Sequence, residues 1–307
     1  MLTKESRQTL EKQQYGIAGR HSAVKICSWT KKSIRNEDVC YKEKFYGIKS
    51  HRCMQITPNL ACCNRCIFCW RDLSTPTVTE WKKEWQIDSP EEIFLKCLEE
   101  HRKLLIGFRG NEKADKQKLA EAFEPNQVAI SLSGEPVLYP KINQLIKLLK
   151  EKGMSTFLVT NGQYPDILEN IELPSQLYIS IDAPNKELFE KIEQSAHPDA
   201  WERFNRSLEA VRKLKCKTAA RITLIKNVNM EDLDGYKQLI QKAMPNYIEV
   251  KAYMFVGSSR QRLTIKHMPY HEEVKQFAIE LEKILPDYKI VDEKAESRVV
   301  LLEKIKD

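Results

Sequence analysis

The amino-acid sequence predicts an α/β fold in which helices cover both faces of a parallel sheet. Short apolar runs typical of strands occur six times between residues 53 and 256, and helical patterns separate them. Such alternation indicates βαβ units and a buried parallel sheet. No linker rich in Gly, Ser or Pro and no short repeat interrupts the 307 residues. We therefore expect an N-terminal extension, residues 1–51, followed by one domain, residues 52–307.

The expected elements follow one another along the chain. Residues 1–26 are mostly polar, and we expect most of them to be helical. The apolar runs predict strands at 53–58, 127–132, 155–160, 176–181, 219–226 and 247–256, with two further strands near 288–291 and 297–302. Helical patterns cover 89–106, 140–151, 164–171, 200–214, 231–243 and 270–284. The charged stretch 109–118 is expected to be an exposed insertion.

Composition narrows the class of protein. Hydrophobic residues make up 42% and charged residues 30% of the chain, which is typical of a globular protein. No apolar run approaches the roughly 18 to 20 residues that cross a bilayer, and the N-terminus lacks the apolar core of a signal peptide. We therefore expect a soluble, cytoplasmic protein. In such a protein, nine cysteines favour metal or redox chemistry over a disulfide scaffold.

The excess of positive charge lies in the N-terminal part of the chain. Residues 1–80 contain 14 Lys and Arg against 7 Asp and Glu, whereas the other 227 residues contain 36 of each kind. A basic field around a reaction centre suits an anionic partner, above all nucleic acid, and we expect Lys31, Lys32 and Arg35 to contribute to it. Charge alone is equally compatible with an ordinary solvated basic surface.

The most specific motif is C-x3-C-x2-C, formed by Cys62, Cys66 and Cys69. The aromatic Phe68 directly precedes the last cysteine. Three thiolates at this spacing can bind three corners of a 4Fe–4S cluster and leave the fourth iron open for a small molecule. A zinc site is an alternative, although structural zinc usually has four ligands. The register that starts at Cys63 resembles a ferredoxin motif but lacks the fourth cysteine followed by proline, so we regard Cys63 as a non-ligand.

Three further cysteines, Cys27, Cys40 and Cys53, lie upstream with twelve residues between successive members. This spacing is too wide for one loop, so the fold must bring them together if they act jointly. They could hold a second cluster, or each could be a buried small side chain. Lys42 lies close to Cys40, and a lysine in such a setting can form a Schiff base with a carbonyl compound, although most lysines are solvated surface residues.

Polar residues follow the predicted strands at the ends where parallel βα folds build their sites. The first strand leads into the cysteine motif and the second into Ser133-Gly134-Glu135-Pro136. Gly134 permits close approach of a ligand to the backbone, and Glu135 can accept a hydrogen bond from an ammonium group. Later strand ends carry Thr160-Asn161-Gly162, Ser180-Ile181-Asp182 and Lys226-Asn227. Each of these could also be an ordinary cap or turn residue.

The cysteine motif, the aromatic residue and the Ser-Gly-Glu-Pro segment together resemble the signature of the radical S-adenosylmethionine (SAM) enzymes. The resemblance implies a partial (β/α)6 TIM-like barrel. It also implies a 4Fe–4S cluster on Cys62, Cys66 and Cys69 whose open iron binds SAM, so that an electron can cleave SAM to a 5′-deoxyadenosyl radical.

The same resemblance assigns SAM contacts to individual residues. Gly134 and Glu135 would contact the methionyl amino group, and Ser133 departs from the Gly-Gly-Glu that the family often has. Phe68 would pack near the adenine. The polar strand ends would contact the ribose and the carboxylate through Asn161, Ser180 and Asp182.

A closer resemblance extends over nearly the whole chain. The upstream cysteines at their twelve-residue spacing, the segment CYKEKFYG (40–47) and the segment ACCNRCIFCWRD (61–72) together are similar to the archaeal tRNA 4-demethylwyosine synthases. The resemblance implies an enzyme of the carbon–carbon lyase or ring-forming class. Its substrate would be N1-methylguanosine beside the anticodon of tRNA-Phe, and pyruvate would be the two-carbon donor.

This family resemblance also implies roles for the upstream residues. Cys27, Cys40 and Cys53 would hold a second 4Fe–4S cluster, and Lys42 would form an imine with pyruvate, with Lys44 as the nearest alternative. Eukaryotic relatives carry a flavodoxin-like domain, for which this chain has no room, so an external electron donor is expected. We also expect a monomer without membrane association. Two other functions remain open: another two-cluster radical SAM enzyme, and a non-catalytic RNA-binding protein with structural zinc.

Overall fold

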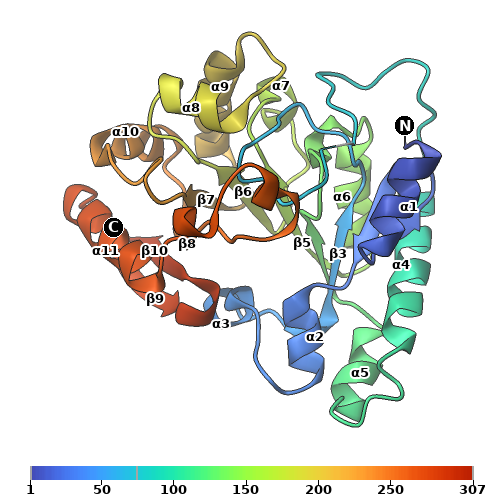
Figure 1. Ribbon diagram of the computed structural model, residues 1–307. Helices are drawn as coiled ribbons and strands as arrows, with labels where there is room; N and C mark the ends of the chain where they lie inside the picture. The colour runs from blue at the N-terminus through green and yellow to red at the C-terminus, as the bar shows by residue number, and fades with distance from the viewer. Residues whose placement is uncertain (1, 74, 306–307) are drawn as a thin grey trace. The chain divides into compact units, whose positions relative to one another are not determined.

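The structure is a computed structural model that describes residues 2–73 and 75–305. Contacts within the chain divide it into two compact units. Unit 1 comprises residues 2–62 and 75–158, and unit 2 comprises residues 63–73 and 159–305. Strands and helices alternate in each unit (Figure 1), so the predicted α/β class is confirmed. The predicted domain boundary between residues 51 and 52 stays a prediction.

The strands of unit 1 pair in the order in which they occur along the chain. They are β1 (Gly16–Ala18), β2 (Ser22–Lys25), β3 (Cys53–Thr57), β4 (Gln127–Ile130) and β5 (Ser155–Thr160), whose last two residues belong to unit 2. β2 pairs antiparallel with both β1 and β3, whereas β3, β4 and β5 are parallel to one another. The parallel strands are the first three that the sequence predicted.

Helices connect these strands. The α-helices of unit 1 are α1 (Lys4–Lys12), α2 (Ser28–Ile34), α3 (Tyr41–Tyr46), α4 (Pro90–Ile106), α5 (Lys116–Ala122) and α6 (Ile142–Glu151), and two short 3₁₀ turns are η1 (Ser50–Arg52) and η2 (Pro136–Leu138). The long helix α4 starts as predicted. The Ser89 hydroxyl accepts a hydrogen bond from the Glu92 N–H at 3.2 Å, and the Glu92 carboxylate accepts one from the Ser89 N–H at 2.8 Å.

The N-terminal segment differs from the expectation of a mostly helical structure. Only α1 is helical before residue 26, and β1 and β2 form a hairpin. Gly16 and Gly19 disfavour a continuing helix, and the buried side chains of Ala23 and Val24 instead add to the sheet beside β3. The stretch 109–118, predicted as an exposed insertion, contains the start of α5, which is capped by the Asp115 carboxylate.

The sheet of unit 2 has the order β6 (Gln176–Ser180), β7 (Lys217–Leu224), β8 (Tyr247–Ala252), β10 (Val299–Lys304) and β9 (Tyr288–Lys294). The strands β6, β7 and β8 are parallel and were predicted. Antiparallel pairing of β10 with β8 and of β9 with β10 closes this edge, and both tail strands were predicted as well.

Helices also alternate with the strands of unit 2. The α-helices are α7 (Pro165–Leu168), α8 (Lys186–Glu193), α9 (Ala200–Lys213), α10 (Leu233–Ala243) and α11 (His271–Ile284), and the 3₁₀ turns are η3 (Gly257–Gln261), η4 (Ile265–His267) and η5 (Ala295–Ser297). Figure 1 shows α11 lying along β9 and β10, against which it packs. Helix α8 was not predicted. It begins where the Asn185 side chain accepts a hydrogen bond from the Leu188 N–H at 3.1 Å.

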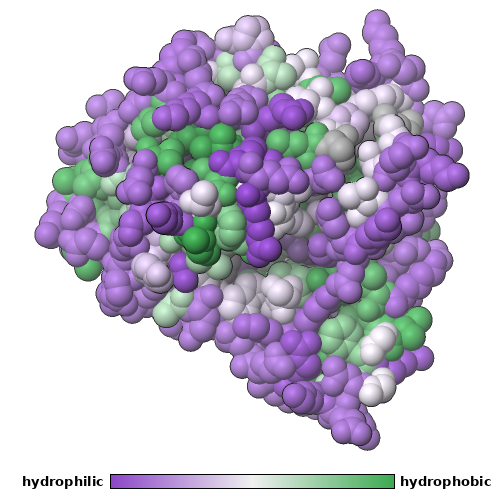
Figure 2. Space-filling model, in the orientation of Figure 1, coloured by the Kyte–Doolittle hydropathy of each residue, from purple (hydrophilic) through white to green (hydrophobic). Residues whose placement is uncertain are grey.

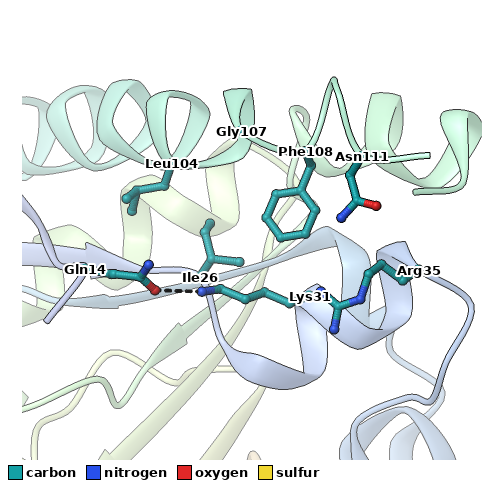
Figure 3. A pocket seen from close by; sticks show the side chains of 8 residues that line it. All are labelled: Gln14, Ile26, Lys31, Arg35, Leu104, Gly107, Phe108 and Asn111. Carbon is teal, nitrogen blue, oxygen red and sulfur yellow. Dashed lines mark hydrogen bonds between the residues drawn. The ribbon is translucent and has the colours of Figure 1, made fainter. Parts of the chain in front are cut away.

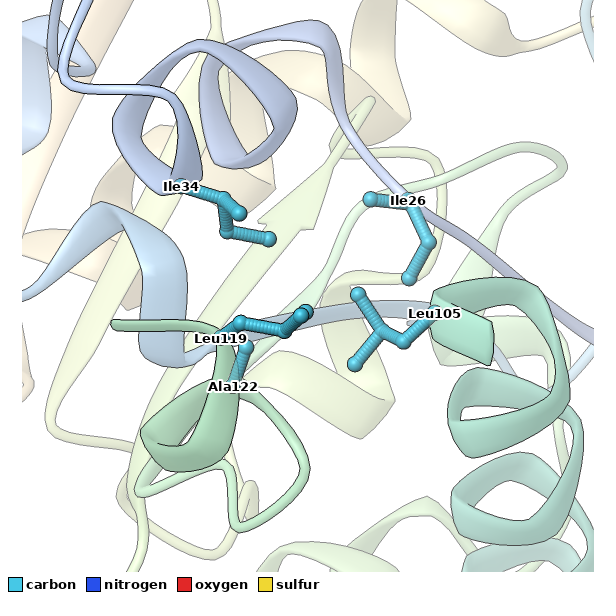
Figure 4. Packing of buried hydrophobic residues seen from close by; sticks show 5 residues of the cluster. All are labelled: Ile26, Ile34, Leu105, Leu119 and Ala122. Carbon is cyan, nitrogen blue, oxygen red and sulfur yellow. The ribbon is translucent and has the colours of Figure 1, made fainter. Parts of the chain in front are cut away.

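Within the described ranges 2–73 and 75–305, no helix combines the length and the apolar composition that a membrane crossing requires. Apolar side chains instead gather in cores. Figure 4 shows one such cluster in unit 1, in which Ile26, Ile34, Leu105, Leu119 and Ala122 point toward one another. They come from α2, α4, α5 and the residue that follows β2, so this cluster fixes the α2 segment against the long helix α4.

Replacing one member of this cluster should destabilise unit 1. Leu105 is fully buried, whereas the adjacent Ile106 is 53% exposed. We expect Leu105→Ala to lower the free energy of unfolding by about 2–5 kcal/mol, because it removes buried methyl groups and leaves a cavity. Ile106→Ala, the matched control, should change it by about 0.5 kcal/mol or less. Urea unfolding measures both, and equal losses for the two variants would contradict this packing.

Candidate active site

Unit 1 brings Cys27, Cys40 and Cys53 together. Cys27 and Cys40 directly precede the short helices α2 and α3, and Cys53 begins β3. Burial raises the pKa of the Cys53 thiol to about 12. The negative charges of Cys27 and Cys40 contribute to this rise in pKa, and the ammonium group of Lys42 opposes it. These electrostatic effects place Cys27, Cys40 and Lys42 each in the neighbourhood of Cys53.

Ser50 ties together the segments that carry these cysteines. Its hydroxyl accepts a hydrogen bond from the Cys40 N–H at 2.8 Å, and its carbonyl accepts one from the Thr30 hydroxyl of α2 at 2.9 Å. Its own N–H donates to the Glu43 carboxylate of α3 at 2.8 Å. Ser50 and Thr30 are buried, so water does not compete for these bonds. The sequence analysis missed Ser50, and no motif marks it.

The two candidate lysines differ in burial. Lys42 is 9% exposed, and its Nζ lies 5.2 Å from the centre of the Phe157 ring. The face of an aromatic ring attracts a cation, which helps to hold the amine in this buried position. Lys44 is exposed. The structure therefore favours Lys42 over Lys44 as an amine that could hold a carbonyl compound away from water.

The end of β3 is connected to the Ser-Gly-Glu-Pro segment by the side chain of Asn59. Its Oδ1 accepts a hydrogen bond from the Ala61 N–H at 3.0 Å, and its Nδ2 donates to the carbonyls of Ala61 at 3.0 Å and of Glu135 at 3.3 Å. The Glu135 N–H in turn donates to the Ala61 carbonyl at 2.9 Å. Asn59 thus links the residues just before Cys62 to Glu135. The sequence analysis did not single it out.

Gly134 makes this close approach possible. Its φ is +71°, and a Cβ at this position would collide with the Asn59 carbonyl oxygen and lie 2.7 Å from that of Ala61. The position therefore requires glycine both for its backbone angle and for the space. Glu135 is buried, and its carboxylate accepts a hydrogen bond from the Val137 N–H at 3.2 Å.

In unit 2, the segment that carries Cys66 and Cys69 is anchored at several points. The Cys69 N–H donates to the Cys66 carbonyl at 3.1 Å, which forms a tight turn, and the Ile67 N–H donates to the Ile192 carbonyl of α8 at 2.9 Å. The Arg262 Nε donates to the Ile67 carbonyl at 3.1 Å, and its guanidinium also donates to the Cys69 carbonyl. The cysteine turn is therefore held by residues far along the chain, which the sequence analysis missed.

A second anchor follows the last cysteine of the motif. The Ser258 N–H, at the start of η3, donates to the Trp70 carbonyl at 3.0 Å. Gly257 has φ +59°, and a Cβ there would collide with the same carbonyl oxygen. The chain after Cys69 can therefore approach η3 only because residue 257 is glycine.

Glu193 is a buried carboxylate beside one cysteine of the motif. It accepts hydrogen bonds from the Cys66 thiol at 2.8 Å and from the Asn64 amide at 2.7 Å. Burial raises the pKa of Glu193. Burial also raises the pKa of Asp182 to about 8, and the charge of Glu193 adds to that rise. Glu193 lies at the end of the unpredicted helix α8 and was therefore missed.

The structure places the remaining predicted SAM residues individually. The Asn161 amide donates to the sulfur of the fully buried Cys63 at 3.3 Å, so Asn161 lies beside the cysteine segment. The Asp182 carboxylate accepts a hydrogen bond from the Thr223 N–H of β7 at 2.7 Å. Ser180, the last residue of β6, and Phe68 are both half-buried.

Among residues 2–73 and 75–305, no three His, Cys, Asp or Glu side chains converge as ligands of one metal ion would. A 4Fe–4S cubane makes a different demand, because each of its thiolates binds a separate iron at a separate corner. Cys27 and Cys40 directly precede α2 and α3, Cys53 begins β3, and all three are half-buried, which is compatible with thiolates that bind separate irons. In the C-x3-C-x2-C motif, Cys62 is buried, and Cys66 and Cys69 are half-buried in one turn.

Comparison with protein families gives two matches. The model of the radical SAM superfamily matches residues 56–240, and a model described as wyosine base formation matches residues 242–304. Among curated proteins, the chain is 49% identical over 306 residues to the S-adenosyl-L-methionine-dependent tRNA 4-demethylwyosine synthases of Pyrococcus abyssi and Pyrococcus horikoshii, with 98% of this chain and 89% of each relative covered. The human TYW1 is 43% identical over 98% of this chain, which corresponds to 41% of the human protein.

Solved structures agree with these matches. A structure of TYW1 with a lysine–pyruvate adduct bound superposes with a TM-score of 0.89 and 38% identity, covering 99% of this chain and 97% of the other. A crystal structure of archaeal TYW1 gives a TM-score of 0.80 and 35% identity with the same coverage. The expected fold, an α/β partial (β/α)6 barrel of the radical SAM type, is confirmed.

The contact of Gly134 with the β3 end can be tested against a matched glycine. Gly153 also has positive φ, +73°, but nothing lies within 4 Å of a Cβ there. Gly153→Ala should therefore cost only the left-handed backbone strain of about 1–2 kcal/mol. Gly134→Ala should cost at least about twice as much, because the added methyl group also displaces the Asn59 backbone. Urea unfolding compares the two variants, and equal losses would contradict the collision.

Proposed function

Because this chain belongs to the family of S-adenosyl-L-methionine-dependent tRNA 4-demethylwyosine synthases, within the radical SAM superfamily, we propose that it converts N1-methylguanosine beside the anticodon of tRNA-Phe to 4-demethylwyosine. Pyruvate is the two-carbon donor, and the reaction forms a carbon–carbon bond, releases the carboxyl carbon and closes a ring. An external donor supplies the electron. The protein acts as a monomer in the cytoplasm.

The observation that carries this proposal is the position of Lys42 among Cys27, Cys40 and Cys53. A radical SAM motif alone requires none of these four residues. Pyruvate chemistry through an imine requires an amine that is shielded from water, and the buried Lys42 against the Phe157 ring meets that requirement. The lysine–pyruvate adduct in the TYW1 structure, 38% identical to this chain, supports the same assignment.

The radical SAM family implies SAM and a 4Fe–4S cluster, and we assign that cluster to Cys62, Cys66 and Cys69. A second 4Fe–4S cluster is held by the three upstream cysteines. When bound, the first cluster together with SAM would supply the radical chemistry that takes hydrogen from the methyl group of the substrate.

Lys42 provides the amine for pyruvate. Its Nζ adds to the ketone carbonyl, and loss of one water gives the imine, so the two-carbon donor is tethered before it meets the tRNA. Burial of the amine and the adjacent Phe157 ring keep bulk water from hydrolysing the imine.

We assign the orientation of the SAM molecule to the residues that the family resemblance marks. Glu135 accepts a hydrogen bond from the methionyl amino group, and Gly134 positions it, because only glycine allows this segment to approach the Asn59 and Ala61 carbonyls. Phe68 packs near the adenine. The ribose and the carboxylate are contacted by the residues at the later strand ends, Asn161, Ser180 and Asp182.

The tRNA substrate requires exposure of one base. A guanosine stacked beside the anticodon cannot present its methyl group to the radical, so it must leave the stack. The excess positive charge of residues 1–80 provides the complementary attraction for the phosphates of the tRNA.

The first prediction of this proposal concerns substrate-dependent SAM cleavage. Anaerobically reconstituted protein with a chemical reductant and pyruvate should release 5′-deoxyadenosine with tRNA-Phe that carries N1-methylguanosine, and only background amounts with unmethylated tRNA. Cys62→Ala should abolish cleavage because the cluster loses a ligand. Cys216→Ala is the matched control, because Cys216 is a half-buried cysteine outside both sets, and it should cleave SAM like the wild type. Chromatography of 5′-deoxyadenosine measures all four reactions.

The iron and sulfide content of the wild type and of a triple variant shows whether the motif binds a cluster. Two cubanes correspond to about eight irons, which should fall to about four when Cys62, Cys66 and Cys69 are all replaced by Ala. A Cys62→Ala protein that still cleaves SAM would overturn the assignment of the motif. Zinc without acid-labile sulfide would favour a non-catalytic protein.

The second prediction concerns the imine. Borohydride should reduce the adduct of labelled pyruvate to a stable secondary amine on Lys42, which peptide mass spectrometry can locate. Lys42→Ala should lose the label. Lys44→Ala should keep it, because the exposed Lys44 is not part of the buried site. Label that survives Lys42→Ala and disappears in Lys44→Ala would move the imine to the second lysine.

A further inference from the structure

Unit 1 contains a surface hollow of about 390 Å³ that has no part in the site described above. It lies between α2 and the C-terminal end of α4, and Figure 3 shows the side chains around it. The lining residues are Gln14, Ile26, Lys31, Arg35, Leu104, Gly107, Phe108 and Asn111. Its volume is in the range of pockets that bind small molecules or parts of larger ligands.

One side of the hollow is apolar. Phe108 and Leu104 are partly buried and pack against the cluster that contains Ile26 and Leu105. Figure 3 shows the Phe108 ring projecting into the hollow from the segment after α4. Figure 2 shows apolar side chains among hydrophilic ones over this corner of unit 1. The core cluster thus holds an aromatic ring at the surface, where a planar ligand can stack on it.

The other side is polar and cationic. The Lys31 Nζ donates to the Gln14 Oε1 at 2.9 Å, and Figure 3 shows this bond across the hollow. Arg35 is paired with Glu37 through two hydrogen bonds of 2.7 Å, so its charge is offset. The Gln14 amide is uncharged, so this hydrogen bond does not neutralise the positive charge of Lys31. The Asn111 Oδ1 accepts a hydrogen bond from the Lys113 N–H at 3.0 Å, and its amide NH2 can donate to the edge of a base.

We propose that this hollow binds one unstacked nucleotide of the tRNA. The base stacks on Phe108, the amides of Gln14 and Asn111 bond to its edge, and Lys31 contacts the adjacent phosphate. Aromatic stacking combined with amides and a cation is the usual way in which proteins hold single-stranded RNA. This inference rests on the proposed function, because it takes tRNA as the ligand, and it places one contact of the N-terminal basic region at defined residues.

The test is the affinity for tRNA-Phe over a salt series, measured by fluorescence anisotropy. Phe108→Leu should raise the Kd about tenfold, which is within the range for the loss of one base stack. Lys31→Ala should raise the Kd and reduce the slope of log K against log salt by about 0.7, because one phosphate contact is lost. Lys147→Ala, a lysine with 69% of its side chain exposed on α6, is the matched control and should bind like the wild type.

Two further measurements keep the result interpretable. Phe108 also supports the core cluster, so melting temperatures are compared, and Phe108→Tyr, which keeps the ring, should retain the affinity. Wild-type Kd and salt slope in both Phe108→Leu and Lys31→Ala would overturn the proposal. It would also be overturned if AMP bound as tightly as tRNA and lost this affinity in Phe108→Leu, because the hollow would then hold a free nucleotide. Formation of 5′-deoxyadenosine by the wild type on methylated tRNA tests the proposed function separately, so either conclusion can fail without the other.

Discussion

The side chain of Asn59 is the contact on which the geometry around Cys62 depends. After β3 the chain leaves the sheet, and the buried Ala61 N–H and carbonyl lose the pairing that a strand would provide. Asn59 satisfies both groups and also reaches the Glu135 carbonyl. Leaving one such buried group without a partner costs about 1–3 kcal/mol, so the turn has little freedom to adopt another shape. The Asn59 amide and the Glu135 N–H, which also donates to the Ala61 carbonyl, together fix the spacing between the proposed cluster ligand and the proposed SAM contact.

Among Lys42 and the three upstream cysteines, opposite charges reduce the energetic cost of burying one another. A buried ammonium group and buried thiolates are each unfavourable alone, because both lose hydration. Burial, and then Cys27 and Cys40, raise the pKa of the Cys53 thiol, and Lys42 opposes this rise, so the cation would offset part of the repulsion once the thiols are deprotonated. Metal ligation requires deprotonated thiols, which makes a neighbouring cation more favourable still. The charge states of the lysine and the cysteines are thus coupled, so binding of a ligand to one of them affects the others.

The sequence predicted those parts of the fold that are encoded by local patterns. The six parallel strands and the two tail strands are apolar runs of four residues or more, and each was found at its expected place. The hairpin β1–β2 was missed because strands of three and four residues carry too little periodicity. Helix α8 was missed because it has only eight residues, and Asn185 is its only strong cap signal.

The site residues show the same division between local and distant information. Both sets of cysteines and Lys42 are visible in the sequence because spacing and residue type mark them. Glu193 contacts Cys66 across 127 residues, and Arg262 contacts the same segment across more than 190. Such contacts exist only after the chain has folded, and a single glutamate or arginine on a helix or turn carries no signal of its partner. The predictable residues are therefore those proposed to carry chemistry, and the unpredictable ones are those that hold them in place.

The superfamily match begins at residue 56, and the segment before it carries the features that distinguish this protein from a generic radical SAM enzyme. That segment contains Cys27, Cys40 and Cys53, the buried Lys42, and four of the residues that line the hollow beside α2. Helix α2 serves both purposes, because Cys27 precedes its first turn while Lys31 and Arg35 project from its later turns into the hollow. The core cluster of Ile34 and Leu105 holds this helix against α4. One short helix, fixed by apolar packing, thus sets the distance between the proposed pyruvate site and the proposed RNA contact.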